Sequence, residues 1–264
     1  MTPIQSVIIS VIEGITEFIP ISSTGHMIIT EKLLNIPEDD FVKVFTIAIQ
    51  LGAILSVVVL YWKRFFDFTK WQFYLKLVVG VIPALILGFI FSSRIDKLLE
   101  SSLTVAIAML VGGLVLLFID KLFINPRIKT ENQIGYKSAL LIGVWQCIAM
   151  IPGFSRSAAS IIGGMQQKLT RSLAAEFSFF LAVPTMLAAT GYKLLKYIKQ
   201  DGSFTSEQIK LLAIGNIISF VVALIAIKFF INYLKKHSLK IWGIYRVIVG
   251  LILLVLILTG NIDR

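Results

Sequence analysis

Six long apolar runs, separated by polar loops, constrain the fold of this 264-residue chain more than any other feature. They lie at 44–62, 77–91, 103–119, 177–192, 211–227 and 241–258. A helix needs roughly 20 mostly apolar residues to cross the hydrocarbon core of a bilayer, and these runs approach that length. Only 15% of the residues are charged, whereas a soluble domain carries about 25%. The sequence therefore predicts an all-α polytopic membrane protein.

Two further apolar segments, at 4–34 and 138–165, are interrupted near their middle. Pro20 and Gly25 are expected to break the first, and Pro152-Gly153 the second. Neither arm of either segment comfortably spans a hydrocarbon core of about 30 Å. Broken backbone at that depth is tolerated where it is buried in protein or lines a wet cavity. We therefore expect each segment to form a re-entrant helix hairpin.

The chain divides into two halves with the same plan. Residues 1–131 and 132–264 each contain one hairpin followed by three crossings. An odd number of crossings places the second half upside down relative to the first, as in the inverted repeats of transporters. At one constant spacing, Glu13 aligns with Gln146 and Ser23 with Arg156. The expected architecture is two inverted repeats that form one integral membrane domain.

The first hairpin concentrates polar residues that are costly inside a bilayer. Its central stretch reads Glu13-Gly-Ile-Thr-Glu17-Phe-Ile-Pro20-Ile-Ser22-Ser23-Thr24-Gly25-His26. A spacing of four places Glu13 and Glu17 on one helix face, where two like charges repel unless a proton or a cation intervenes. Backbone N–H groups at a helix start bind phosphate oxygens. Intramembrane polar groups indicate a functional site.

The second hairpin carries a matching cluster around one arginine. Residues 152–157 read Pro-Gly153-Phe-Ser155-Arg156-Ser157, and Gln146 and Ser160 flank them. The planar guanidinium of Arg156 suits a phosphate group, and neighbouring hydroxyls add hydrogen bonds. Together the two clusters supply acid–base groups, a nucleophile and an anion clamp, which is what phosphoryl transfer requires.

Both clusters resemble motifs of one known family. The first resembles the E-G-x-x-E-F-x-P-[IV]-S-S-T-G-H motif of the undecaprenyl-diphosphate phosphatase (bacitracin-resistance) family, and the second its P-G-x-S-R-S motif. The resemblance runs the full length of the chain, including 48–52. Ala158 and Ser160 stand where the family usually has Gly and Thr. These changes keep a small residue and a hydroxyl.

The resemblance implies an enzyme that hydrolyses undecaprenyl diphosphate to undecaprenyl phosphate and inorganic phosphate. Such an enzyme recycles the carrier lipid for peptidoglycan synthesis and confers bacitracin resistance. The implied partners are the polyprenyl diphosphate and the lipid bilayer of a bacterial cytoplasmic membrane. Oligomeric state is left open, a homodimer included.

The resemblance and the residues together suggest roles for the site. Ser23 is the favoured nucleophile and His26 the competing one. Glu17 acts as general base or orients one, while Glu13 supports it or joins Glu17 in holding a divalent cation such as Mg²⁺ or Ca²⁺. No organic cofactor is expected. The phosphate is expected to bind Ser22, Thr24, Gly153, Ser155, Arg156 and Ser157, with Gln50, Gln146 and Ser160 in support.

Other readings of these residues remain open. Arg156 could pair with a glutamate as a structural salt bridge, and Gln50 could make an interhelical hydrogen bond. An inverted repeat alone favours a transporter or flippase for a polyprenyl phosphate. Hydroxyls placed among carboxylates and an imidazole favour covalent or acid–base chemistry instead. A second lipid-phosphatase superfamily is excluded, because its histidine six residues after the arginine is Ile162 here.

The net charge of +10 is distributed over loops and does not form a nucleic-acid-binding face. Thirteen Lys and Arg residues fall in the loops at 63–70, 121–137, 168–171 and 228–240. Nine fall on the opposite side, at 32–43, 94–97, 193–210 and Arg264. Basic loops favour the cytoplasm, so the termini and the catalytic pocket are predicted to face outward.

Two absences in the sequence also carry predictions. Cys147 is the only cysteine, so neither an intrachain disulfide nor a Cys/His metal cluster is expected. The first apolar segment carries Glu13 and Glu17, and no Lys or Arg precedes Lys32. A cleaved signal peptide is therefore not expected.

Overall fold

The computed structural model describes residues 1–37, 39–99, 101–201 and 203–262, and Arg264 lies outside these ranges. The described chain is almost entirely helical, apart from loops and one isolated bridge between Ile128 and Leu169. Its α-helices are α1 Pro3–Thr16, α2 Ser23–Leu33, α3 Asp40–Leu60, α4 Trp62–Phe65, α5 Trp71–Leu99, α6 Ser102–Leu122, α7 Tyr136–Gln146, α8 Arg156–Gln166, α9 Arg171–Asp201, α10 Ser206–Leu234 and α11 Lys240–Leu258. Two short 3₁₀ turns are η1 Glu131–Gln133 and η2 Cys147–Met150.

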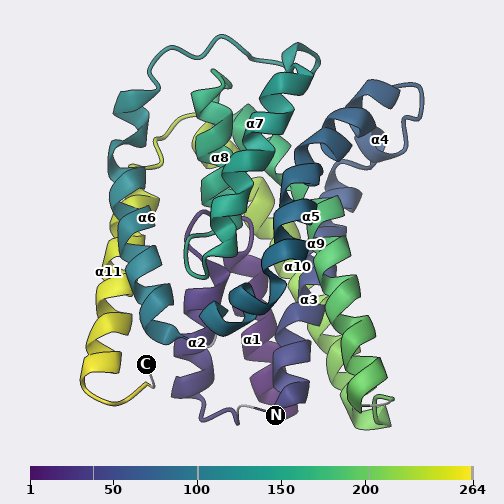
Figure 1. Cartoon of the computed structure of the whole chain (residues 1–264), viewed down its shortest axis with the longest axis vertical. Coiled ribbons are helices and arrows are strands. Elements are labelled where there is room, and N and C mark those ends of the chain that lie inside the picture. Colours follow the sequence, from purple (N-terminus) through teal and green to yellow (C-terminus); the bar gives the residue numbers. More distant parts are fainter. Residues whose placement is uncertain (38, 100, 202, 263–264) are drawn as a thin grey trace.

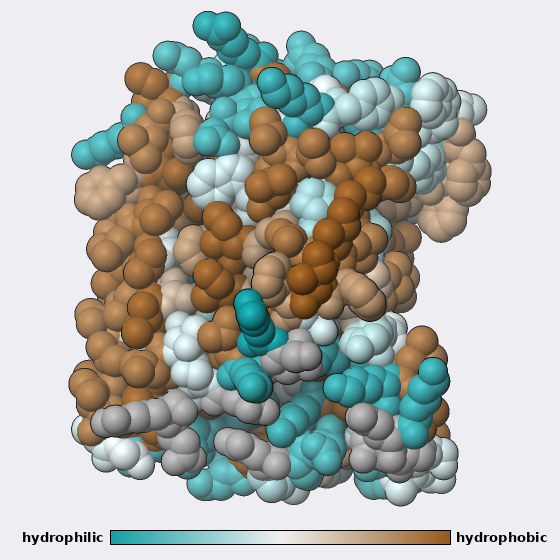
Figure 2. All heavy atoms as spheres, in the orientation of Figure 1, coloured by the Kyte–Doolittle hydropathy of each residue, from teal (hydrophilic) through white to brown (hydrophobic). Residues whose placement is uncertain are grey.

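Within the described ranges, six helices are long and apolar enough to cross a membrane: α3, α5, α6, α9, α10 and α11. This confirms the predicted number of long apolar helices. Figure 2 shows hydrophobic residues over the middle of one face of the molecule, with hydrophilic residues gathered at its top and bottom. The distribution is that of a protein whose middle faces lipid.

Several helices extend beyond the predicted apolar runs. The run at 177–192 lies inside a helix that covers Arg171–Asp201. Lysine is a good helix former, and its long side chain can reach an interface while its stem stays on apolar surface. Hydropathy alone therefore underestimates the length of a helix whose ends are basic.

The two hairpins approach the middle of the molecule from opposite ends. Figure 1 shows α1 and α2 in the lower half, near both termini, and α7 and α8 in the upper half. The breaks of the two hairpins contact each other, because Ser157 Oγ donates a hydrogen bond to the carbonyl of Ile19 at 3.0 Å. Residues that are far apart in sequence are thus brought into one central region.

Several pairs of packed helices each join a helix from the first half of the chain to a helix from the second half. Helix α1 packs against α10, α7 against α5, and α6 against α11. Small residues permit the close approach. A Cβ at Gly143 of α7 would lie 2.0 Å from the carbonyl oxygen of Gly80 in α5. A Cβ at Gly14 of α1 would lie 2.9 Å from the carbonyl oxygen of Ser219 in α10.

The prediction that Gly25 breaks the first hairpin is wrong. Gly25 lies in the first turn of α2, and the chain turns before the helix, at Ser22. A Cβ on Gly25 would meet Sδ of Met109 at 2.1 Å. The glycine therefore serves the contact between α2 and α6, a tertiary role that local sequence does not reveal.

Candidate active site

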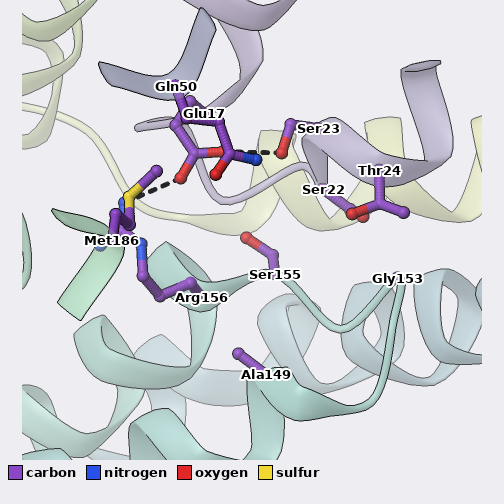
Figure 3. A pocket seen from close by; sticks show the side chains of 10 residues that line it. All are labelled: Glu17, Ser22, Ser23, Thr24, Gln50, Ala149, Gly153, Ser155, Arg156 and Met186. Atoms are coloured by element: carbon purple, nitrogen blue, oxygen red, sulfur yellow. Dashed lines mark hydrogen bonds and ion pairs between the residues drawn. The ribbon is translucent and has the colours of Figure 1, made fainter. Parts of the chain in front are cut away.

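A cavity of about 170 Å³ lies where the two hairpin breaks meet (Figure 3). Both hairpins and two of the long helices supply its walls. The lining residues are Glu17, Ser22, Ser23, Thr24, Gln50, Ala149, Gly153, Ser155, Arg156 and Met186. Most of the site residues proposed from the sequence are thus brought together around one space.

A carboxylate and a hydroxyl are joined by a hydrogen bond on one wall. Glu17 follows the last turn of α1, and Ser23 is the first residue of α2. Ser23 Oγ donates a hydrogen bond to Glu17 Oε2 at 2.7 Å. This is the contact expected between a nucleophilic hydroxyl and its general base.

Arg156 faces this pair from the second hairpin. Its Nη2 donates to Glu17 Oε1 at 3.2 Å, and its Nη1 donates to the carbonyl of Ser178 at 3.2 Å. The side chain also lies over the ring of Phe18, with the guanidinium carbon 5.7 Å from the ring centroid. Arg156 Nε is buried and has no hydrogen-bond partner within the described chain. The predicted salt bridge to a glutamate is therefore present, and it lies on the wall of the cavity.

Two helix starts point into the same cavity. Ser22 caps α2 with its Oγ accepting from Gly25 N, and Ser155 caps α8 with its Oγ accepting from Ala158 N. Both serines have a positive backbone angle φ, 70° for Ser22 and 75° for Ser155, which residues other than glycine rarely adopt. Such strain persists where the surrounding structure fixes it, and it clusters at functional sites. Helix N-termini favour anions, so this arrangement suits a phosphate group.

Four of the proposed residues lie behind the cavity and do not line it. Ser157 donates to Ile19, as described above, and Ser160 Oγ donates to the carbonyl of Arg156 at 2.7 Å. Gln146 Nε2 donates to Thr185 Oγ1 at 3.1 Å. Glu13 is buried, interacts with the side chain of Glu17, and leaves its Oε1 without a hydrogen-bond partner within the described chain. These residues support the cavity wall.

His26 also lies outside the cavity lining. It is one turn into α2, and its Nδ1 lies 2.7 Å from the carbonyl oxygen of Ser22. Its Nε2 lies 2.8 Å from the hydroxyl of Tyr245, and the two rings stack with centroids 5.5 Å apart. A carbonyl can only accept, so Nδ1 carries the hydrogen and Nε2 accepts from Tyr245. One ring nitrogen therefore holds the turn at Ser22, and the other ties α2 to α11.

Sequence reasoning missed several residues that the fold brings to the site. Met186 of α9 and Ala149 of η2 line the cavity, while Tyr245 and Arg246 of α11 contact the hairpin that forms it. Tyr245, Met186 and Ala149 stand in apolar runs and carry no distinguishing signal. Arg246 did carry one, since it is the only charged residue within 241–258.

The described residues contain no group of three or more His, Cys, Asp or Glu side chains arranged to hold a metal ion. Glu13 and Glu17 provide a pair of carboxyl groups, and Glu13 Oε1 is a buried acceptor without a donor. Magnesium is commonly held by one or two carboxylates together with substrate phosphates. The donor set therefore fits a divalent cation that also takes oxygen ligands from a phosphorylated substrate.

Comparison with known proteins gives one consistent family. The model of the family "Bacitracin resistance protein BacA" matches residues 6–252. A protein of Flavobacterium johnsoniae named undecaprenyl-diphosphatase is 56% identical over 257 residues, which cover 97% of this chain and 96% of the relative. A protein of Aquifex aeolicus with the same name is 47% identical over 255 residues, 96% and 97% of the two chains. The family match spans all the residues that line the cavity, and the chain belongs to the bacitracin resistance protein BacA family.

Proposed function

We propose that this protein is an integral-membrane hydrolase that converts undecaprenyl diphosphate to undecaprenyl phosphate and inorganic phosphate. The observation that carries the proposal is the cavity in which Glu17, Ser23 and Arg156 are joined by hydrogen bonds. The substrate is inferred from relatives named undecaprenyl-diphosphatase, which match nearly the full length of the chain. The reaction regenerates a carrier lipid for cell-wall synthesis, and it accounts for bacitracin resistance.

The first chemical step is attack by Ser23. Glu17 accepts the hydroxyl hydrogen while Ser23 Oγ forms a bond to the terminal phosphorus. The bond from that phosphorus to the bridging oxygen breaks, and undecaprenyl phosphate leaves. Arg156 and the N–H groups at the starts of α2 and α8 stabilise the charge on the equatorial oxygens. Positioning and electrostatic stabilisation carry most of the catalysis in reactions of this type.

The second step returns the enzyme to its starting state. Water attacks the phosphoserine, the bond between phosphorus and Ser23 Oγ breaks, and inorganic phosphate is released. Glu17, which carries the proton taken from Ser23, returns it to Ser23 Oγ as that oxygen leaves the phosphorus, and it takes up the proton lost by the attacking water. Release of that proton with the phosphate restores the Glu17 carboxylate. Ser23 is favoured over His26 as the nucleophile because Ser23 faces the cavity, whereas both nitrogens of His26 are engaged elsewhere.

Glu17, which lines the cavity, would hold a divalent cation together with substrate oxygens, and Glu13, which contacts Glu17 from behind the cavity, would complete the pair of carboxyl groups. When bound, such a cation neutralises negative charge on the diphosphate and polarises the phosphorus–oxygen bonds. The protein groups would keep their roles, because each carboxylate oxygen of Glu17 has a second lone pair beside the one that accepts from Ser23 or Arg156.

We also propose the finer architecture expected from the sequence, with two re-entrant hairpins in two inverted repeats. Several relationships support it. Ser22 and Ser155 have the same unusual backbone conformation and the same cap. They are separated by the spacing that aligns Glu13 with Gln146. The first hairpin packs on a helix of the second half, since α1 contacts α10. The second hairpin packs in the same way on a helix of the first half, since α7 contacts α5.

The membrane orientation follows from the basic loops. Helix α4 and the loop at 123–135 lie at the upper end of Figure 1, and both termini lie at the lower end. The upper end carries the larger group of Lys and Arg residues and is assigned to the cytoplasm. The substrate then enters from the outer face of the cytoplasmic membrane, with its polyprenyl tail in lipid and its diphosphate in the cavity.

The direct test is release of phosphate from undecaprenyl diphosphate by the purified protein in detergent. The expected products are one undecaprenyl phosphate and one phosphate per substrate, and a chelator should lower the rate until Mg²⁺ or Ca²⁺ is restored. A protein that binds the lipid and leaves the diphosphate intact would contradict the proposal. Full activity in the presence of a chelator would contradict the proposed role of the cation and would leave the proposed hydrolysis standing.

A further inference from the structure

Arg246 is a fully buried arginine in the apolar helix α11, at 0% exposure. Its guanidinium makes five hydrogen bonds, and every acceptor is a backbone carbonyl. Five is also the number of N–H donors that an arginine side chain has. The side chain is thus completely satisfied without contacting another polar side chain through these bonds.

The acceptors belong to both hairpin breaks. Nη1 donates to Pro20 O at 3.4 Å and to Phe154 O at 2.8 Å, while Nη2 donates to Gly153 O at 2.9 Å. Two further bonds, to the carbonyls of Ala108 and Met109, fasten the guanidinium to α6. One side chain therefore joins the two breaks to each other and to a long helix.

These carbonyls lie very close in sequence to the reactive groups. Pro20 is three residues before Ser23, and Gly153 is three residues before Arg156. Gly153 also lines the cavity. Because each break is irregular backbone, its carbonyls lack the helical partners that would otherwise fix them. Arg246 supplies those partners, and it thereby sets the separation of the two cavity walls.

Arg246 carries a buried positive charge. Among the described residues, no ion pair involves it. Burying a cation without a counter-charge is costly even when carbonyl oxygens accept its hydrogen bonds, so such a residue is retained where it serves a purpose. A diphosphate in the adjoining cavity carries negative charge that this buried cation would stabilise.

The neighbouring helix is shaped around this side chain. A Cβ at Gly112 of α6 would lie 2.3 Å from Arg246 Nη2, and one at Gly113 would lie 3.0 Å from Arg246 Cβ. The glycine pair thus makes room for both the guanidinium and the stem. A substitution at Gly112 displaces the guanidinium while leaving the arginine in place.

We propose that Arg246 is the positioning residue of the phosphate site, holding the Ser23 and Arg156 walls at the distance that hydrolysis requires. This inference rests on the proposed function. Arg246 acts through the backbone of both breaks, so its loss should lower kcat far more than it raises KM. Misplacing reacting groups by about 1 Å can cost about a hundredfold in rate, and this is the expected loss for Arg246→Met.

The experiment measures phosphate release from undecaprenyl diphosphate by the full-length wild type and by matched variants. Arg246→Lys keeps the charge and some donors, so its kcat should fall between those of the wild type and Arg246→Met. Gly112→Ala should lower kcat in the same way. Lys240→Met is the control, because it removes an exposed cation from the same helix and should keep wild-type kcat.

A double variant separates positioning from general stability. If Arg246 acts by placing Ser23, the combined loss in Ser23→Ala with Arg246→Met should fall short of the product of the single losses. Thermal unfolding and size-exclusion profiles identify variants that are not folded. If Arg246→Met does not fold, Arg246→Lys and Gly112→Ala decide the question.

Wild-type kcat in the folded Arg246 and Gly112 variants would overturn the inference, and so would strictly multiplicative losses in the double variant. A rise in KM with unchanged kcat would also overturn it. The failure of the proposed function has a different signature, since the wild-type protein itself would then release no phosphate.

Discussion

The hydroxyl of Ser23 lies 2.7 Å from one carboxylate oxygen of Glu17, although the two residues stand on opposite sides of the break between α1 and α2. The other oxygen of Glu17 accepts from Arg156 of the second hairpin at 3.2 Å. One carboxylate therefore connects a hydroxyl, an arginine and both hairpins. This relationship gives each residue a separable role that substitution can test.

Removing either member of the Ser23–Glu17 pair should abolish most turnover. General-base catalysis contributes about a hundredfold to ten-thousandfold, so Glu17→Gln should lower kcat within that range, and Ser23→Ala at least as much. The measurement is phosphate release in detergent. Ser10→Ala is a suitable control, because Ser10 is a buried α1 serine that donates only to a carbonyl of its own helix at Ser6. Wild-type rates in Glu17→Gln would contradict the general-base role.

Glu13→Gln should be milder than Glu17→Gln. Glu13 does not line the cavity, and the aligned position in the second half is already neutral, at Gln146. A glutamine keeps the shape of the side chain and its hydrogen-bonding capacity, so the fold should be retained. The two variants should be compared for kcat and for the Mg²⁺ concentration at half-maximal rate. An equal loss of kcat in both would show that the carboxylates act as one unit.

Much of the site could be predicted because its signals are local. Pro20 and Pro152-Gly153 mark the breaks, and polar residues inside apolar segments mark the chemistry. The spacing that aligns Glu13 with Gln146 also aligns the two polar clusters, and the fold brings the two breaks into contact. Charge and hydropathy patterns gave the six long helices, although the basic ends of α9 continue further than the apolar run.

Other features depend on contacts between distant parts of the chain. The role of Gly25 is set by Met109, and the partner of His26 is Tyr245, 219 residues away. Neither contact follows from local periodicity. Arg246 was visible as a lone charge in an apolar run, but its partners are backbone carbonyls and carry no sequence signal. Its function could be inferred only from the folded chain.

Tyr245→Phe should reduce turnover modestly. The variant keeps the stacked ring and loses the hydroxyl that donates to His26 Nε2. A single hydrogen bond contributes about 0.5–1.5 kcal/mol, which corresponds to a loss of up to about tenfold. The measurement is kcat at saturating substrate, with Tyr192→Phe, an exposed tyrosine of α9, as the control. A loss as large as that of Ser23→Ala would instead make His26 a reacting group.

Cysteine labelling tests the proposed orientation. Native Cys147 lies in the second hairpin, half-buried, and should resist aqueous maleimides in intact cells. In a Cys147→Ser background, Asp39→Cys should label from outside, because Asp39 precedes α3 near the end that holds the termini. Asn132→Cys, at the opposite end, should label only after the membrane is opened. The reverse pattern would move the cavity entrance to the cytoplasmic side.

The central claim is that two halves of the chain build one phosphate site. The most direct measurement is phosphate release by Ser23→Ala, Arg156→Lys and the double variant, with Arg171→Lys as an arginine control. Arg171 is paired with Asp120 and lies outside the cavity lining. A lysine cannot reproduce the planar paired contacts of a guanidinium. Loss of one preorganised donor typically costs about a hundredfold to a thousandfold.

We predict a loss of that size in Arg156→Lys, a near-normal Arg171→Lys, and a combined loss in the double variant that falls short of the product of the single losses. Such a result means that Ser23 and Arg156 act on the same bound phosphate. Multiplicative losses, or a folded Arg156→Lys enzyme with the wild-type rate, would place Arg156 outside the reaction and leave its bond to Glu17 as a structural salt bridge.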